Sequence, residues 1–352
     1  MGLSIELLER RCRDAATGAY AWDALLRDIG EWVGGSKGMM LGAGLLGPHR
    51  HTLDWNHDPK GLARYNSYYN RFDPRTPYAR LTPLHGAQLG QKYVRNESIA
   101  KTEYFQAINL DGDVKDSVHG IIANDAEIGR RSISIQRGFK EEFFAEREAE
   151  RLAVILPTLE RAMKDSIRVA RSVAGHMSGN GYCYMVVDRA RRVIFADSSQ
   201  DQYLARSGPL SSTGDLLASG NEGVDRAIEQ AIETALGERP VSLHLSGVKM
   251  EFSRVPQALA WLADKDHCFL AIVAQEKQAE TSARLFATAH DFSAREADIL
   301  AILLAEDDLR LAADRCGLTY ETVRWHLKNM QMKCGVSRRE TMLAAARKGR
   351  IG

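Results

Sequence analysis

The stretch that most constrains the fold of this chain lies near its C-terminus, between Thr319 and Gly335. Thr319 is a good helix N-cap, because a threonine hydroxyl accepts a hydrogen bond from an unpaired first-turn amide. Apolar residues then recur at helical spacing and predict a buried stripe. The opposite face carries long donors or cations, which suits either a solvated surface or the major groove of DNA. The stripe is Val323, Leu327 and Met330, and the donors are Arg324, His326, Lys328 and Lys333.

Capping signals around this stretch predict three more short helices. A capping box at Ser293–Glu296 opens an apolar helix, and Asp308 can cap a second one that Gly317 ends. Another capping box at Ser337–Glu340 opens a fourth helix. Four short helices with a glycine-containing turn between the second and the third are typical of a helix-turn-helix.

Residues 292–350 therefore resemble the LuxR/GerE-type DNA-binding domain. Four residues depart from its pattern, since Glu306, Ala312, Cys316 and Cys334 replace a usual glycine, isoleucine and two leucines. The matching positions are Ser293, Arg295, Glu296, Ile299, Leu300, Ala313, Gly317, Thr322, Val323, His326, Leu327, Asn329, Met330, Lys333, Gly335, Val336 and Arg339.

The resemblance implies a role for each donor on the third helix. Arg324 and Lys328 match positions that read base edges. Four further residues match positions near phosphates: Thr319, Thr322, His326 and Lys333. Charge agrees, because residues 319–350 hold eight Lys or Arg against two Glu, whereas the whole chain is only +1. A basic segment on an otherwise slightly acidic chain suits a dedicated DNA-binding module.

Composition also indicates the cellular compartment in which the protein works. The five cysteines, Cys12, Cys183, Cys268, Cys316 and Cys334, are scattered without C-x-x-C spacing, which favours reduced thiols in a cytoplasmic protein. The charged N-terminal segment does not look like a signal peptide. The apolar run Gly38–Gly47 is far shorter than the roughly 18 residues of a membrane span. We therefore expect a soluble, cytoplasmic protein that does not enter a membrane.

A chain of 352 residues predicts two or three domains. Residues 3–33 indicate two helices, and Met39–Leu46 with Pro48–Trp55 indicate a hairpin. The glycines of Gly42–Gly47 fit G-x-G-x-x-G, but no helix follows them, so a dinucleotide site is not expected. A helix over 59–72, another near 100–110 and strands at 118–123 and 132–137 complete an α+β sensor domain of the GAF kind.

Aromatic residues crowd the predicted helix 59–72, which Asp73–Pro74 ends. Such density indicates either a packed core or the wall of an apolar pocket. Tyr65 and Asp73–Pro74 resemble part of the acyl-homoserine-lactone receptor signature, but its flanking tryptophans are absent. The predicted effector pocket contains Trp55, Tyr65, Tyr69, Phe72 and Asp73.

Residues 139–173 predict a nearly continuous helix that Pro157 kinks or breaks. Its apolar stripe suits either a dimer seam or packing on the sheet of its own domain. Residues 181–274 then resemble a PAS domain in the order of their elements: two strands, short helical stretches, a helix over 224–236 and three strands. Residues 275–290 predict a polar helical linker.

No catalytic constellation is present: there is no G-x-S-x-G elbow, Walker loop or H-E-x-x-H motif. His49, His51 and His57 are the nearest approach to a metal site, and they lack a supporting acid or thiolate. The flavin-attaching Asn-Cys-Arg sequence is absent. Three lone histidines could ligate haem but more often serve as ordinary surface or core residues: His176, His244 and His267.

These observations predict an α+β multidomain protein, with two α/β sensor domains before an all-α four-helix DNA-binding domain. The expected boundaries are 1–165 (GAF-like), 172–277 (PAS-like), 278–290 (linker) and 291–352 (helix-turn-helix). We expect a non-enzymatic, cofactor-free transcription regulator that binds an inverted-repeat operator as a homodimer and answers to a small apolar or aromatic effector. RNA polymerase is a further candidate partner. The alternative is a regulator controlled by protein partners through its GAF and PAS surfaces, without a small-molecule ligand.

Overall fold

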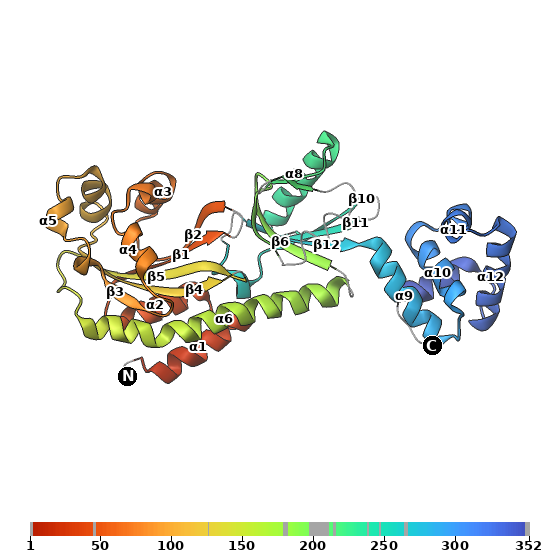
Figure 1. Ribbon diagram of the computed structural model, residues 1–352, viewed down its shortest axis with the longest axis horizontal. Coiled ribbons are helices and arrows are strands. Elements are labelled where there is room, and N and C mark those ends of the chain that lie inside the picture. Colours follow the sequence, from red (N-terminus) through yellow and green to blue (C-terminus); the bar gives the residue numbers. More distant parts are fainter. Residues whose placement is uncertain are drawn as a thin grey trace.

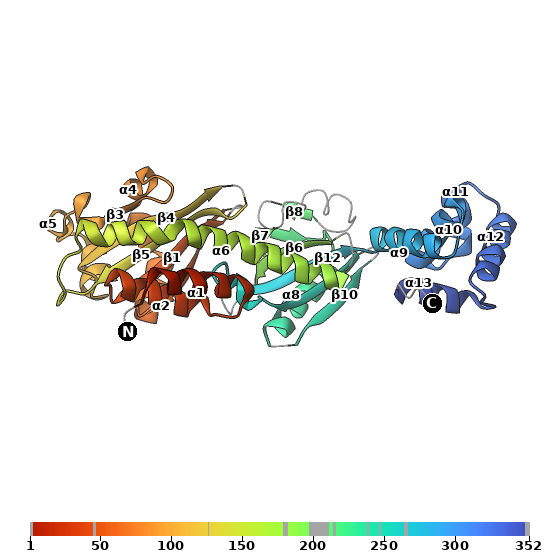
Figure 2. The ribbon, with the colours of Figure 1, turned by 90° about the horizontal axis from the view of Figure 1, so that it is seen from below.

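The computed structural model of this chain describes residues 3–44, 47–125, 127–178, 182–196, 211–213, 216–237, 239–245, 248–263 and 267–348. Figures 1 and 2 show three parts in a row: a first sheet with its helices, a second sheet, and a C-terminal cluster of helices. Both large sheets are five-stranded and antiparallel, which confirms the predicted mixture of helices and sheets. None of the helices in the described ranges is long and apolar enough to cross a membrane.

The first sheet has the strand order β2-β1-β5-β4-β3. The predicted hairpin is confirmed, because β1 and β2 pair directly, and Gly42, Gly44 and Gly47 therefore lie on its strands rather than before a helix. The bounds are β1 (Lys37–Gly44), β2 (Gly47–Trp55), β3 (Ala87–Leu89), β4 (Asp116–Asp125) and β5 (Gly129–Arg137).

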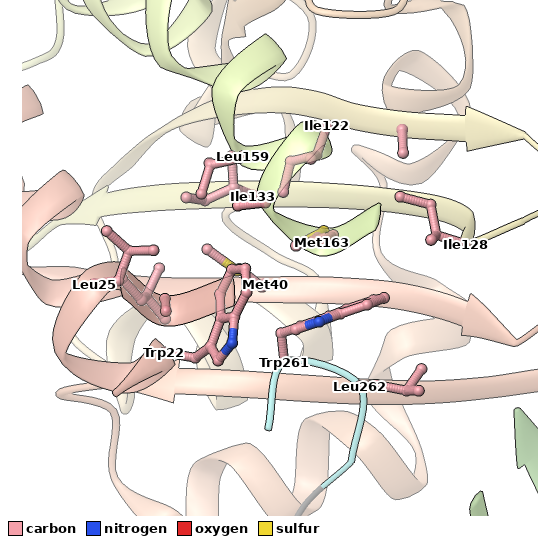
Figure 3. Close-up of a cluster of buried hydrophobic side chains, with 14 of the residues drawn as sticks. Trp22, Leu25, Met40, Ile122, Ile128, Ile133, Leu159, Met163, Trp261 and Leu262 are labelled. Carbon is pink, nitrogen blue, oxygen red and sulfur yellow. The ribbon is translucent and has the colours of Figure 1, made fainter. Parts of the chain in front are cut away.

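Helices α2 (Trp22–Val33) and α6 (Glu146–Ser178) pack on one face of the first sheet, and α1 (Ile5–Thr17) packs against both of them. Successive residues of a strand face opposite sides, so β1, β4 and β5 each send alternate apolar side chains into this layer. Figure 3 shows Met40, Ile122 and Ile133 from the strands beside Trp22 and Leu159 from the helices. All five side chains are at most 3% exposed, and they form the centre of the core.

The opposite face lies under short segments rather than long helices. The single helix expected over 59–72 is wrong: α3 ends at Ser67, whose hydroxyl donates to the Ala63 carbonyl at 2.8 Å, and Tyr68 then leaves helical geometry with φ −135°. The helix expected near 100–110 is a π-helical turn. The segments are α3 (Pro59–Ser67), η1 (Tyr69–Phe72), α4 (Thr76–Leu81), η2 (Gly90–Lys92), α5 (Asn96–Ile99) and η3 (Phe105–Leu110).

Helix α6 is continuous through Pro157, so of the two expected outcomes, a kink or a break, the break is wrong. The helix begins at Glu146 rather than near residue 139. Proline removes one backbone hydrogen bond, but burial of the neighbouring side chains offsets that loss. Leu152, Ile155 and Leu159 are fully buried against the first sheet. This packing fits the alternative in which the helix covers its own sheet.

The second sheet has the order β10-β11-β12-β6-β7, and α8 (Glu222–Leu236) covers one of its faces. The strands expected here are confirmed. A small hairpin, β8 (Ser211–Thr213) with β9 (Leu216–Ala218), occupies part of the range in which short helical stretches were expected, and residues 197–210 of that range lie outside the described residues. The remaining bounds are β6 (Tyr182–Asp188), β7 (Val193–Ala196), β10 (Val241–Leu245), β11 (Val248–Arg254) and β12 (His267–Ala274).

The other face of the second sheet joins the core of the first. Tyr184 on β6 belongs to the same apolar cluster as Trp22 and Leu159. The segment between β11 and β12, which contains η4 (Gln257–Leu259), enters this core and brings Trp261 to 6.2 Å from Trp22, between ring centroids (Figure 3). Trp22 Nε1 donates to the Ala258 carbonyl at 3.0 Å, and Trp261 Nε1 donates to Ser166 Oγ at 2.8 Å. The two sheets therefore share one core, which the sequence did not predict.

The C-terminal cluster contains the four expected helices, and the caps at Ser293, Asp308 and Thr319 are confirmed. The preceding helix, expected as a polar linker, also buries Ala283 and Phe286 in the core of this cluster. The bounds are α9 (Gln275–Ala289), α10 (Ala294–Glu306), α11 (Leu309–Cys316), α12 (Tyr320–Lys333) and α13 (Arg339–Lys348).

Candidate functional site

A cavity of about 320 Å³ lies between the first sheet and the segments α3, α4 and η3. We call it the first-sheet cavity. Its floor is the sheet face that points away from α6, where the strand alternation presents polar side chains. Floor residues include Met39 and Leu41 from β1, Ser117 and His119 from β4, and Ser132 and Ser134 from β5.

Asp73 organises one wall of the cavity. Tyr65 Oη donates to Asp73 Oδ2 at 3.0 Å, and the Arg75 backbone N–H donates to Asp73 Oδ1 at 2.9 Å. Burial, and then the nearby Asp73 and Tyr65, raise the pKa of Tyr104 well above its ordinary value, so this hydroxyl stays a hydrogen-bond donor. Tyr65, Asp73, Arg75 and Tyr104 all line the cavity.

Three polar atoms in the cavity wall are shielded from water and have no hydrogen-bond partner: Arg75 Nε, Asn109 Oδ1 and His119 Nε2. Buried polar groups are normally paired, and one left unpaired costs about 1–3 kcal/mol. Burial lowers the pKa of His119 to about 4, so its imidazole is neutral at pH 7. A polar ligand that paired with these atoms would remove the cost.

Two of the five predicted pocket residues line the cavity, Tyr65 and Asp73, and three do not. Trp55 lies on the opposite sheet face, where its ring is so close to α2 that a Cβ on Gly30 would come within 2.2 Å of it. Tyr69 instead donates its hydroxyl to Glu103 at 2.8 Å, and Phe72 is 53% exposed. Sequence reasoning missed Arg75, Tyr104, Asn109 and His119; the polar alternation Ser117-x-His119 was the signal for β4.

Three of the histidines considered for a metal or haem have described side chains: His57, His244 and His267. The two ring nitrogens of His57 form hydrogen bonds within the protein. Nδ1 lies 2.5 Å from Asp54 Oδ1, and Nε2 lies 2.7 Å from Gln136 Oε1. His244 and His267 lie on β10 and β12. The side chains of His49, His51 and His176 lie outside the described residues. The described part of the chain contains no group of three or more His, Cys, Asp or Glu that could hold a metal ion.

The outer face of α12 is the second candidate site. Val323, Leu327 and Met330 are buried as the stripe predicted, whereas Arg324 and Lys328 are exposed. The same face carries large apolar side chains that the sequence reasoning did not consider. Among them are Tyr320 at 41%, Trp325 at 61% and Met332 at 66% exposure. The helix thus presents cations and aromatic surface together.

The side chains of the other predicted DNA-contacting residues differ in the hydrogen bonds that they already form within the protein. Thr319 Oγ1 accepts the Thr322 backbone N–H at 3.2 Å, so it serves as a cap. His326 is half-buried, and its Nδ1 is shielded without a partner. Lys333 Nζ donates to the Glu296 carboxylate at 2.7 Å and to the Asp291 carbonyl at 2.9 Å. These two acceptors anchor the ammonium to the C-terminal cluster, although the Lys333 side chain is 38% exposed.

No family model matches this sequence, and no curated protein matches it. Among solved structures, the ligand-binding domain of VqsR from Pseudomonas aeruginosa is 18% identical, with a TM-score of 0.35, and the match covers 47% of this chain and 96% of that one. SdiA in complex with octanoyl-rac-glycerol is 10% identical, with a TM-score of 0.34, covering 98% of this chain and 92% of that one. At these TM-scores neither similarity supports a conclusion about fold or function.

Proposed function

We propose that this protein is a transcription regulator in which a small molecule in the first-sheet cavity controls DNA binding by α12. The observation that carries the proposal is the cavity with its three unpaired buried polar atoms. A filled interior would instead favour control by protein partners. The expected GAF-like and PAS-like sensor regions correspond to the first and second sheets in this proposal.

The DNA-binding half of the proposal rests on α12. Its buried stripe fixes the helix on the cluster, while Arg324 and Lys328 extend from the exposed face. Long cationic donors on an exposed helix that follows a tight glycine turn suit readout in the major groove. A single short reading helix gives modest affinity, so we propose a homodimer on an inverted repeat.

The coupling half rests on the shared core. A ligand on one face of the first sheet would shift the packing of β1, β4 and β5, whose opposite face holds α6 and the Trp261 segment. That segment leads through β12 directly into α9 and the C-terminal cluster. The ligand would thereby favour one arrangement of the reading helices over another.

Selection from random duplexes with the full-length chain tests the DNA-binding half. Fluorescence anisotropy on the selected duplex should show that Arg324→Ala loses roughly 1–3 kcal/mol of binding free energy and relaxes sequence preference. The control is Arg226→Ala, an exposed arginine on α8 that should bind normally. A loss that is uniform over all sequences would instead assign Arg324 to phosphate, and no selected sequence at all would contradict the proposal.

A further inference from the structure

Arg75 offers its guanidinium to whatever occupies the first-sheet cavity. Its Nε is buried without a partner, and its Nη2 reaches Asn96 Oδ1 only at 3.4 Å. Among the residues that the structure describes, this guanidinium forms no ion pair. The Asp116 carboxylate acts on this cation only at a distance, and a shielded N–H of a cation that lacks a hydrogen-bond acceptor is costly, so an anionic acceptor would be favoured at this point.

The carboxylates near Arg75 are already occupied by other donors. Asp73 accepts the Tyr65 hydroxyl and the Arg75 backbone N–H. Asp116 accepts the backbone N–H groups of Ser117 and Phe144, both at 2.8 Å. The Nε–H and Nη2–H of an arginine form a planar fork that matches the two oxygens of a carboxylate. The unpaired edge of the Arg75 guanidinium is therefore suited to bind a carboxylate that belongs to a ligand rather than to the protein.

Further polar groups lie beside this fork. Ser117 Oγ and Arg75 Nε are 2.5 Å and 3.5 Å, respectively, from the point where a Cβ on Gly90 would sit. A side chain at position 90 would fill that point, so glycine keeps it open. His119 follows Ser117 on the same face of β4, and the shielded Asn109 Oδ1 remains free to accept an O–H or N–H from the ligand.

The rest of the cavity wall is suited to an apolar body. Met39, Leu41 and Leu62 line it, and Tyr78 stacks on Tyr93 with ring centroids 5.1 Å apart and an interplanar angle of 27°. These two tyrosines are 38% and 36% exposed, so they lie at the outer margin of the cavity. A cavity of about 320 Å³ is at the small end of ligand pockets.

We infer that the ligand is a small organic acid whose carboxylate is held side-on by Arg75 and whose apolar or aromatic body lies against Met39, Leu41 and Leu62. The inference rests on the proposed function, which supplies the cavity as a receptor site, and it adds the charge and the orientation of the ligand.

Isothermal titration of the full-length protein with matched pairs tests the inference. The probes are 3-phenylpropionate and hexanoate, each beside its neutral amide, 3-phenylpropanamide or hexanamide. Each acid should bind at least about tenfold more tightly than its amide, because only the acid is a charged partner for the fork. Arg75→Gln should abolish this preference, and Arg75→Lys should keep part of it, since lysine retains the charge without the fork.

The control is Arg161→Gln, an exposed arginine on α6 that should leave all four affinities unchanged. Amides that bind as well as the acids, or a preference that survives in a folded Arg75→Gln protein, would overturn the organic-acid inference and leave the cavity as a receptor for neutral ligands. Failure of all four probes to bind would count against the inference and the receptor site together.

Discussion

The burial of the His119 imidazole should be visible in the pKa of that one residue. Burial, and to a lesser extent Arg130, lower its folded-state pKa to about 4, although the Asp73 carboxylate opposes this. The unfolded chain takes up a proton near the ordinary pKa of about 6.5. Stability should therefore fall as pH drops below about 6.5, by up to about 3 kcal/mol near pH 4.

Between pH 7.5 and 5.5 this linkage predicts a loss of about 1 kcal/mol that His119→Gln should not show. Urea unfolding at both pH values measures the difference between the two proteins. An NMR titration of the histidine ring protons gives a direct check: one signal, absent in His119→Gln, should stay in its neutral position down to about pH 5. A midpoint near 6.5 for that signal would contradict the buried placement.

Asn109 and Arg75 show why these cavity-lining residues were hard to recognise from sequence. Tyr65 and Asp73 stand out because they lie in an aromatic cluster that ends at a proline. Arg75 lies two residues farther on, in what looks like an ordinary polar turn. Asn109 reaches the cavity only because η3 folds over the start of β4, where Asn109 Nδ2 donates to the Val114 carbonyl at 2.9 Å. Tertiary contacts, rather than local pattern, assign both residues to the site.

Among the elements, α12 has two lysines with different tasks. Lys333 pairs with Glu296, whose side chain is only 5% exposed, whereas Lys328 extends from the outer face. Burial would raise the pKa of Glu296, but hydrogen bonds from Lys333 and Ser293 lower it below its ordinary value. The contribution of this pair is therefore present above the ordinary glutamate pKa and lost as pH falls through the lowered one.

Lys333→Met should destabilise the C-terminal cluster by about 1–2 kcal/mol, because it leaves a buried carboxylate short of a donor while the partly exposed ammonium limits the loss. Lys328→Met should change the free energy of unfolding by less than about 0.5 kcal/mol. It should weaken DNA binding by the amount that one phosphate or base contact contributes. Thermal unfolding and anisotropy measured on both variants separate the two roles. Equal stability losses would show that the lysines are not distinguished as described.

The elements themselves were largely predictable, because caps and apolar spacing are local signals. Ser293, Asp308 and Thr319 each begin a helix where the sequence indicated. The errors came where packing outweighs propensity. Pro157 lies inside a helix that packing on the first sheet stabilises. The aromatic helix expected over 59–72 ends instead at Ser67. The local sequence does not show how far burial offsets the helix stability lost to a proline or to a hydroxyl that bonds to the backbone.

For the whole molecule, the segment around Trp261 joins the two sheets. Trp261 is 2% exposed, donates to Ser166, and has the Arg131 guanidinium 5.1 Å from its ring centroid. Burial also lowers the pKa of Arg131 to about 10. The side chain is thus surrounded by groups from α6 and β5 of the first sheet, although its segment belongs to the second.

Trp261→Ala should cost about 3–5 kcal/mol, because it leaves a large cavity in the shared core. Since the core spans both sheets, the two should lose stability together, as one shifted transition in far-UV circular dichroism during urea unfolding. Trp325→Ala, which truncates an exposed tryptophan on α12, should shift the curve by less than about 0.5 kcal/mol. Two separate transitions, with only one shifted, would argue that the sheets are energetically independent.

In the proposed mechanism, the contents of the first-sheet cavity control binding of DNA by α12. The most direct test of this mechanism is the affinity of the full-length protein, purified from its own host, for a selected duplex before and after bound small molecules are extracted. We expect extraction to change the dissociation constant at least about tenfold, within the usual range of allosteric coupling, and we expect return of the extract to reverse the change. The same affinity before and after extraction, with or without the extract, would contradict the mechanism.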